Sequence, residues 1–396
     1  MKKKELNIIT LILMISFASV NAVLFTPALP QISKYFNISN NATQITIIIF
    51  LIGYSLGQLI YGPIANRFGR KSALFIGITI QVIASLLCAF SSPLHSFSLL
   101  VWSRLLLAIG SCVGMKITFT MVSESYDRIR GAEILSYTML AFAISPAIGT
   151  TIGGYLAQSF GFASCFYFLA LYGITVACFV MSLPETLKEK DYTALKLRNI
   201  LLKYSKEIKL ELIGYAFIMG ASTAIVYLWA ALSPYIAIDV LHVSEKQYGI
   251  WNLIPSIGMI IGFMLSSKLV KIMSPIKNIF LGLIITIFGI TFMAVLFIYY
   301  KITMSSLFLP MVIIYIGEAI ILNNSSSSAT YSAKDKSNAS AILNFINMGV
   351  ATIWVIYATS IKTTDILFIP KIFFGITLLI GIITVILSTK ITQRSS

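Results

Sequence analysis

A short basic turn between two long apolar runs is the feature that most constrains how this chain can fold. The turn reads Gly62-Pro63-Ile64-Ala65-Asn66-Arg67-Phe68-Gly69-Arg70-Lys71. Two glycines, a proline and three cations are poorly suited to hydrocarbon, so the turn predicts an aqueous hinge that joins two membrane spans. Three positive charges in so short a loop also place it on the cytoplasmic side.

The composition agrees with a chain that lies largely in a lipid bilayer. Hydrophobic residues make up 58% of the 396 positions and charged residues only 11%, whereas a soluble domain carries about 25% charged residues. Cationic loops held against anionic lipid explain the formal net charge of +15, so no nucleic-acid partner is expected. All four cysteines fall in apolar runs, and neither a disulfide framework nor a metal site is predicted.

Apolar runs long enough to cross a bilayer recur twelve times. They cover approximately 8–33, 44–65, 72–92, 98–122, 132–157, 161–183, 210–238, 248–270, 276–299, 305–327, 338–361 and 367–390. The stretch 184–209 is long, polar and rich in lysine, which is typical of a linker with an amphipathic helix on the membrane surface. The sequence predicts an all-α membrane protein with two pseudo-symmetric six-helix bundles, residues 1–183 and 210–396, joined by this cytoplasmic linker.

The loop charges fix the expected orientation. Of the 29 Lys and Arg residues, 22 fall on the side of the basic turn, five on the other side and two within a span. This bias places both termini and the linker in the cytoplasm.

An internal repeat relates the two halves. A shift of 205 residues brings three glycines of the first half, Gly53, Gly57 and Gly77, onto three of the second, Gly258, Gly262 and Gly282. The matches fall in the same spans of each half and predict a duplication. A duplicated bundle predicts a substrate site near the midplane and transport by rocking of the halves.

The basic turn is similar to the signature G-x-x-x-D-R-x-G-R-K between spans two and three of the major facilitator superfamily, with Asn66 in place of the aspartate. The stretches 27–32, 104–115 and 145–154 narrow the resemblance to twelve-span bacterial drug:proton antiporters of the bicyclomycin- and chloramphenicol-resistance type. The resemblance implies the major facilitator fold and a multi-pass transporter, not an enzyme, in the bacterial inner membrane. It further implies a monomer without a cofactor.

The residues expected to serve gating and helix packing lie in the basic turn and in span five. They are Gly62, Asn66, Arg67, Gly69, Arg70, Lys71, Pro146, Gly149, Gly153 and Gly154. Pro146 removes one backbone hydrogen bond and bends its span. Gly149 and Gly153, one turn apart, open a groove for a neighbouring helix.

Glu318 is the one acid that lies clearly inside a predicted span. The resemblance implies that spans one, four, seven and ten line the cavity, and Glu318 falls in span ten. An ionised carboxyl is costly in such a setting, which suits a reversible proton carrier. Recognition of a cationic substrate and an ion pair with Lys116 or Arg104 are the alternatives. Related antiporters carry an acid in span one, where this chain has Val23.

Two cations fall within span four. A guanidinium at a helix centre costs about 2.5–3.5 kcal/mol unless it is solvated or paired, so Arg104 should face the bundle interior. It either contacts the substrate or the proton pathway, or clamps backbone carbonyls of a neighbouring span. Lys116 either snorkels to the cytoplasmic surface or lines an inward-facing cavity.

Other polar and aromatic side chains are candidates for the cavity wall: Asn21, Phe25, Tyr227, Trp229, Asn323, Asn324 and Trp354. The cluster 323–328 is either a helix end that reaches water or a source of hydrogen bonds at an inner gate. The aromatic residues either face a flat ligand or pack among helices.

The sequence therefore predicts a secondary active exporter of drugs or amphipathic metabolites that exchanges its substrate for protons. The alternative is an importer or exchanger of an anionic nutrient, peptide or siderophore, because two cations near the cavity suit a negative charge. No Walker-type loop is present in the sequence, which argues against an ATP-driven pump. The motifs do not encode the identity of the substrate.

Overall fold

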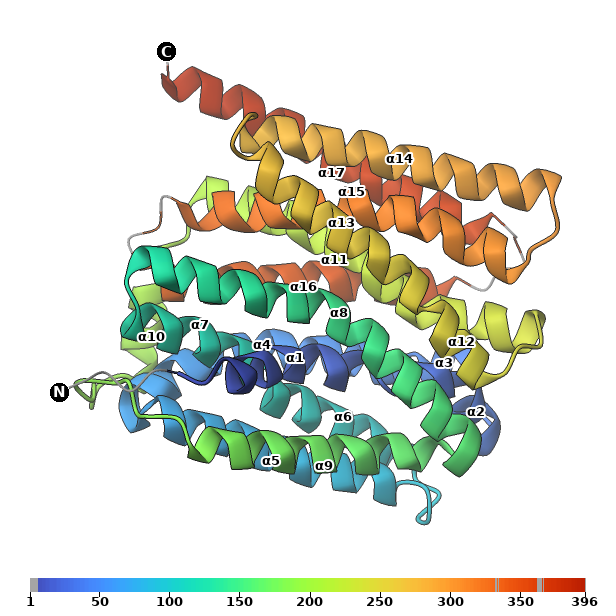
Figure 1. The fold of residues 1–396 in the computed structure, drawn as a ribbon, viewed down its shortest axis with the longest axis horizontal. Coiled ribbons are helices and arrows are strands. Elements are labelled where there is room, and N and C mark those ends of the chain that lie inside the picture. Colours follow the sequence, from blue (N-terminus) through green and yellow to red (C-terminus); the bar gives the residue numbers. More distant parts are fainter. Residues whose placement is uncertain (1–5, 332, 334, 362–364, 366, 396) are drawn as a thin grey trace. The chain divides into compact units, whose positions relative to one another are not determined.

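The computed structural model describes residues 6–331, 333, 335–361, 365 and 367–395, and this part of the chain is helical (Figure 1). Twelve helical segments in it are long and apolar enough to cross a membrane, which confirms the predicted count. They are Ile8–Tyr35, Asn40–Phe68, Arg70–Phe90, Phe97–Ser125, Glu133–Phe160, Phe162–Met181, Leu210–Val240, Glu245–Leu269, Pro275–Tyr299, Met304–Tyr331, Lys336–Ser360 and Phe368–Lys390.

Several spans are built from more than one helix. The first half contains α1 (Ile8–Val23), η1 (Thr26–Ala28), α2 (Leu29–Tyr35), α3 (Asn40–Thr43), α4 (Ile45–Phe68), α5 (Arg70–Phe90), α6 (Phe97–Ser111), α7 (Val113–Ser125), α8 (Arg128–Phe160), α9 (Phe162–Met181) and α10 (Leu197–Ser205). The second half contains α11 (Leu210–Pro234), η2 (Tyr235–Val240), α12 (Glu245–Trp251), α13 (Leu253–Leu269), α14 (Pro275–Tyr299), α15 (Met304–Tyr331), α16 (Lys336–Ser360) and α17 (Phe368–Ser395). Span one is interrupted after α1, and span four breaks at Cys112 between α6 and α7.

Helix contacts divide the chain into two units. Unit 1 consists of Met1–Lys206 and Ser244–Gly249, and unit 2 of Glu207–Val243 and Ile250–Ser396. Residues 184–206 therefore pack with unit 1, while the predicted domain limits at 183 and 210 stay a prediction. The short helix α10 in this segment exposes three leucines, Leu197, Leu201 and Leu202, and its predicted place on the membrane surface also stays a prediction.

The repeated glycines lie at equivalent helix contacts in the two units. In unit 1, Gly53, Gly57 and Gly77 abut span four, and in unit 2, Gly258, Gly262 and Gly282 abut α15. The contact of Gly77 with the carbonyl of Gly110 matches that of Gly282 with the carbonyl of Gly317. A Cβ atom at these positions would press into the facing helix, so close packing requires glycine there. The repeat in sequence is thus a repeat in packing.

The predicted loop at Gly62–Lys71 is mostly helical, which corrects the sequence interpretation. The helix α4 continues through Pro63 to Phe68, and the turn to α5 is the single residue Gly69 with φ +107°. Pro63 has no N–H and leaves the carbonyl of Leu59 without its helical donor. The hydroxyl of Tyr204 in α10 donates to this carbonyl at 2.8 Å. A proline that usually ends a helix is tolerated because residues 184–206 supply the missing hydrogen bond.

Candidate functional site

A buried carboxyl lies where three helices of unit 2 meet. Glu318 of α15 is fully buried, and it accepts hydrogen bonds from Ser222 of α11 and from Thr286 of α14, the latter at 3.3 Å. Within the described part of unit 2, no Lys or Arg lies within ion-pair distance of Glu318. A carboxyl held by hydroxyl groups can take up and release a proton without breaking an ion pair.

Unit 1 contains a buried guanidinium instead. Arg104 of α6 is fully buried and donates to three backbone carbonyls, those of Asn21 (2.8 Å), Ala22 (3.3 Å) and Thr46 (3.3 Å). Its Cζ atom also lies 4.1 Å from the ring centroid of Phe25 and 4.4 Å from that of Phe50. Two of these carbonyls belong to the last turn of α1, where a helix lacks donors of its own and where a cation is favourable. These are the contacts of a clamp on backbone carbonyls.

Asn21, a predicted cavity residue, belongs to a polar network inside unit 1. Its side chain donates to the carbonyl of Phe17 at 2.7 Å and accepts from Gln81 Nε2 at 2.7 Å. Gln81 also donates to Ser85 and to the carbonyl of Leu169, so the network joins α1, α5 and α9. Asn21 and Phe25 are both fully buried.

The predicted polar cluster of span ten lies inside a helix. Because α15 runs to Tyr331, residues 323–328 are not a helix end that reaches water, and that interpretation is wrong. Asn323 and Asn324 both donate to Ser266 of α13 at 2.9 Å, and Asn324 accepts from Asn278 of α14 at 3.1 Å. The cluster ties three helices of unit 2 together.

The predicted aromatic residues lie on different helices of unit 2. Trp229 of α11 is buried, packs edge-on against Phe308 and donates to Asn252 at 3.1 Å. Tyr227 of α11 and Trp354 of α16 are half-buried, and Trp354 packs edge-on against Tyr357. Their role at a cavity wall stays a prediction.

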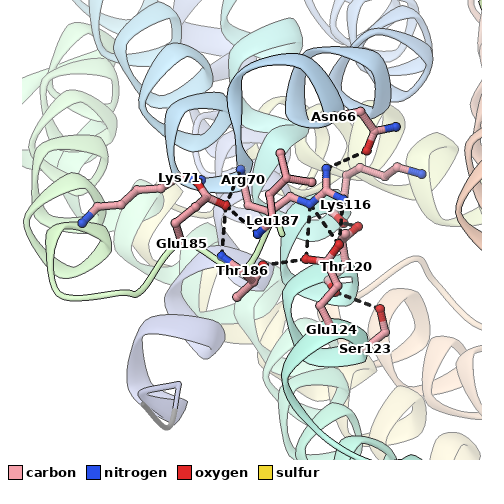
Figure 2. Close-up of polar contacts among 10 residues, drawn as sticks. All are labelled: Asn66, Arg70, Lys71, Lys116, Thr120, Ser123, Glu124, Glu185, Thr186 and Leu187. Carbon is pink, nitrogen blue, oxygen red and sulfur yellow. Dashed lines mark hydrogen bonds and ion pairs between the residues drawn. The ribbon is translucent and has the colours of Figure 1, made fainter. Parts of the chain in front are cut away.

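A second charged cluster lies at one end of unit 1, around the turn between α4 and α5 (Figure 2). Arg70 at the start of α5 pairs with Glu124 of α7, with Nη2 and Oε1 2.7 Å apart. It also donates to the side-chain oxygen of Asn66 at 2.7 Å. Asn66 therefore still accepts one hydrogen bond where the family signature has an aspartate.

The acid that caps this turn comes from outside the signature. The Glu185 carboxylate accepts the backbone N–H groups of Arg70 (2.9 Å) and Lys71 (3.1 Å), the first two residues of α5 (Figure 2). A carboxylate at a helix N-terminus satisfies free N–H groups and complements the helix dipole. The hydroxyl of Thr186 next to it donates to Glu124 at 2.6 Å. Arg70, Glu124 and Glu185 with Asn66 and Thr186 are called the hinge cluster below.

The segment 184–206 is held to the hinge cluster by further contacts. The Arg67 guanidinium lies 4.3 Å from the ring centroid of Tyr192, and the N–H of Asp191 donates to the carbonyl of Asn66 at 3.0 Å. Hydrogen bonds from Thr193 and the nearby ammonium of Lys203 lower the pKa of Asp191 from 3.8 to about 2. The basic turn is thus covered by residues that follow span six.

The predicted packing motif of span five lies against α1. Gly149 of α8 approaches Val20, and Gly153 abuts the carbonyl of Leu24 so closely that a side chain would not fit. Gly154 faces the backbone of Glu245 and Gly249, and the Thr151 hydroxyl donates to the carbonyl of Gly249 at 2.8 Å. The hydroxyl of Ser145, next to Pro146, lies 2.7 Å from that of Ser19.

Sequence reasoning missed several partners of the predicted residues: Gln81, Glu124, Glu185, Tyr204, Ser222 and Thr286. Only the hinge could have indicated one of them, because Pro184-Glu185-Thr186 places an acid directly after span six. Hydroxyls such as Ser222 and Thr286 are common in spans and give no signal until the helices are placed around Glu318.

The sequence profile of the Major Facilitator Superfamily matches residues 10–358. The chain belongs to this superfamily. Its members share the signature at Gly62–Lys71, so the predicted resemblance is confirmed and the hinge cluster is built on that signature.

Relatives of this superfamily member include bacterial transporters and drug-resistance proteins. An uncharacterized transporter from Rickettsia felis is 31% identical over 314 residues, 76% of this chain and 75% of the relative. A bicyclomycin resistance protein homolog from Haemophilus influenzae is 24% identical over 62% of both chains. Multidrug resistance protein D from Escherichia coli is 25% identical over 47% of both chains.

Solved structures support the fold. A D-xylose-proton symporter superposes with a TM-score of 0.76 over 94% of this chain and 96% of that chain, at 13% identity. The xylose transporter XylE from Escherichia coli, in a partially occluded inward open conformation, gives 0.75 over 95% of both chains at 13% identity. At such identity the likeness concerns the fold alone, and it confirms the predicted major facilitator architecture.

Proposed function

We propose that this protein is a secondary active exporter that expels drugs or amphipathic metabolites from the cytoplasm in exchange for protons. It would work as a monomer in a bacterial inner membrane, with both termini and residues 184–206 in the cytoplasm. Relatives named for bicyclomycin and multidrug resistance support the substrate class.

The observation that carries the proposal is the environment of Glu318. This carboxyl is fully buried among hydroxyl groups of Ser222 and Thr286. An ionised acid inside a membrane protein is costly unless it is paired or reaches water. Glu318 would therefore bind a proton when unit 2 encloses it and release that proton when the transport cycle opens it to the cytoplasm. An acid of span ten would replace the customary acid of span one, where this chain has Val23.

Arg104 would act as a positioning residue in this cycle. Its guanidinium is engaged by backbone carbonyls at the junction of α1 and by two aromatic rings. It would hold α1 in register with α4 and α6 so that unit 1 moves as one body. The hinge cluster would similarly keep α4, α5 and α7 together at the cytoplasmic end.

Import or exchange of an anionic nutrient, peptide or siderophore is the second candidate. It is favoured by one observation: Arg70, Arg104 and Lys116 are the buried charged residues of unit 1 among those whose burial is described, and all are cations. Direction of transport separates the two candidates.

Transport into inverted membrane vesicles with an imposed pH gradient, acidic inside, tests the proposal. We expect the amphipathic dyes ethidium and rhodamine B to accumulate in vesicles that contain the protein. Glu318→Gln should abolish accumulation driven by the gradient, whereas Glu207→Gln, which alters another buried acid of unit 2, should retain it. Equal accumulation by the wild type and Glu318→Gln would contradict the role of Glu318. Uptake of anionic nutrients with no dye export would favour the second candidate.

Orientation is tested separately by labelling single cysteines from outside the cell, after replacement of the four native cysteines. A cysteine at His95 should react with an impermeant maleimide, and one at Lys190 should not. Labelling at position 190 would contradict the cytoplasmic placement of the segment 184–206.

A further inference from the structure

Two buried side chains of α4 have polar atoms without hydrogen-bond partners. Gln58 is 1% exposed, and neither its Nε2 nor its Oε1 atom is bonded within the described part of the chain. Tyr61 is also 1% exposed, and its hydroxyl has no partner there either. Buried polar groups in proteins are almost always hydrogen-bonded, and inside a membrane the requirement is stricter. Three such atoms within one helical turn call for a polar occupant.

Neighbours on α4 show which way Gln58 points. Tyr54 and Gly62 lie one helical turn before and after Gln58, so the three positions share a face. The Tyr54 hydroxyl lies 3.8 Å from the sulfur of Met115 in α7. A Cβ atom at Gly62 would lie 3.9 Å from Cε of Lys116, also in α7. Gln58 is bracketed by these contacts and therefore faces the first turn of α7.

Lys116 brings a positive charge to this face of α4. It lies four residues after the break in span four at Cys112, and it is buried, with 7% of its surface exposed. The absence of a side chain at Gly62 leaves room for its stem. An ammonium group, an amide N–H and a phenol hydroxyl are all hydrogen-bond donors, and a carboxylate accepts from all three.

The charge of unit 1 selects among possible occupants. Its buried charges, among residues whose burial is described, are those of Arg70, Arg104 and Lys116. A cationic group placed beside Lys116 would meet a like charge, whereas an anion would be attracted. Water could bond to Gln58 and Tyr61 but would not complement the ammonium group.

We propose that Gln58, Tyr61 and Lys116 form a subsite that binds the carboxylate of an amphipathic substrate. The inference rests on the proposed transport function and narrows its substrates to molecules that join a flat apolar body to an anionic group. Lys116 would supply the charge, and Gln58 and Tyr61 would supply directed hydrogen bonds that distinguish a carboxylate from its ester.

Binding of a matched dye pair to the purified full-length protein tests the subsite. Rhodamine B carries a free carboxylate, and its ethyl ester differs only by masking that group. Fluorescence polarisation should give about tenfold tighter binding of the acid, a difference equivalent to about 1.4 kcal/mol. Lys116→Met and Gln58→Leu should remove this preference and leave ester binding unchanged. Tyr61→Phe, which keeps the ring and hence the packing, should reduce the preference, and Lys190→Met on the exposed segment 184–206 should keep it.

Equal affinity of the wild type for the acid and the ester, or failure to bind either dye, overturns the subsite, and so does an unchanged preference in both Lys116→Met and Gln58→Leu. Vesicle transport separates this outcome from failure of the proposed function. A protein that exports the ester without preferring the acid is a transporter that lacks the subsite. A protein that binds the acid preferentially and moves neither dye has the subsite and is not an exporter of such dyes.

Discussion

The two units share their helix packing and differ in their buried charges. Glycines at equivalent contacts show that Gly110 in α6 and Gly317 in α15 occupy corresponding places, 207 residues apart. The same spacing relates Arg104 to Met311 and Ser111 to Glu318. Each unit thus has one buried ionic residue in this span where the other has a neutral one. The duplicated scaffold kept its close packing, which depends on glycine, while its polar chemistry diverged.

The difference suggests a division of labour. Arg104 satisfies carbonyls at the end of α1 and is surrounded by fixed groups, so its charge stabilises one arrangement of unit 1. Glu318 is bound only by side-chain hydroxyls, which can rotate and accommodate either protonation state. In our proposal unit 1 holds a fixed positive charge and unit 2 carries the exchangeable proton.

The largest expected effect is that of Arg104→Met, which gives unit 1 the residue that unit 2 has at this position. Three buried carbonyls would lose their donor, and unsatisfied buried acceptors cost about 1–3 kcal/mol each. We expect a loss of about 3 kcal/mol in the free energy of unfolding, measured by thermal unfolding in detergent. Arg130→Met removes an arginine from an exposed ion pair and should cost less than about 1 kcal/mol. Similar losses in the two variants would show that the clamp contributes nothing.

Glu124→Gln sharpens the comparison at the cytoplasmic end. The turn of unit 2 that corresponds to the hinge, residues 270–274, has lysines on both sides and no acid in its sequence. Loss of the charge that faces Arg70 should lower the stability of unit 1 by about 2 kcal/mol, the value of a hydrogen bond to a charged group. We also expect slower dye export in vesicles. Glu133→Gln, in an exposed pair with Arg130, is the matched control, and equal effects would contradict the clamp.

Tyr204→Phe tests how the segment 184–206 supports α4. The Tyr204 hydroxyl bonds to the carbonyl that Pro63 leaves free, so its removal should cost about 1 kcal/mol. In the Pro63→Ala background the helix makes its own hydrogen bond to Leu59, and the same change should cost little. A double-mutant cycle of unfolding free energies measures this coupling. Additive effects would mean that Tyr204 does not compensate for the proline.

Asp191→Asn should have the smallest effect, and the effect should depend on pH. Hydrogen bonds from Thr193 and the ammonium of Lys203 lower the pKa of the folded carboxyl to about 2, below its ordinary value of 3.8. The stabilisation by the carboxylate is therefore complete above about pH 4 and is lost as the pH falls through about 2. Thermal unfolding of the variant and the wild type should differ slightly at pH 7 and converge toward pH 2. A difference that stays constant over this range would rule out the carboxylate as its source.

Much of the fold could be predicted because the bilayer imposes length and polarity on each span. The twelve spans, the repeat and the superfamily followed from apolar runs, glycines and one signature. Helix ends were harder: Pro63 and the cluster at Asn323 resemble loops in sequence, yet both lie inside helices. Tyr204 rescues the first and Ser266 and Asn278 bind the second, and these partners are 141, 57 and 45 residues away in the chain.

The candidate site was predicted only in part for a similar reason. Glu318 and Arg104 stand out because charges in spans are costly. Their partners are ordinary hydroxyls and backbone carbonyls, and nothing in their own sequence neighbourhood marks them. Gln58 drew no attention as a neutral amide and became a candidate only when its two polar atoms were found buried without partners.

Proton release on substrate binding tests the central claim, that the exchangeable proton resides on Glu318, most directly. The purified protein is mixed with a saturating transported dye in weakly buffered detergent solution, and the released protons are measured with a pH indicator. We predict that the wild type releases about one proton per bound dye, Glu207→Gln releases the same amount, and Glu318→Gln releases none while still binding the dye. Undiminished proton release by Glu318→Gln would contradict the account.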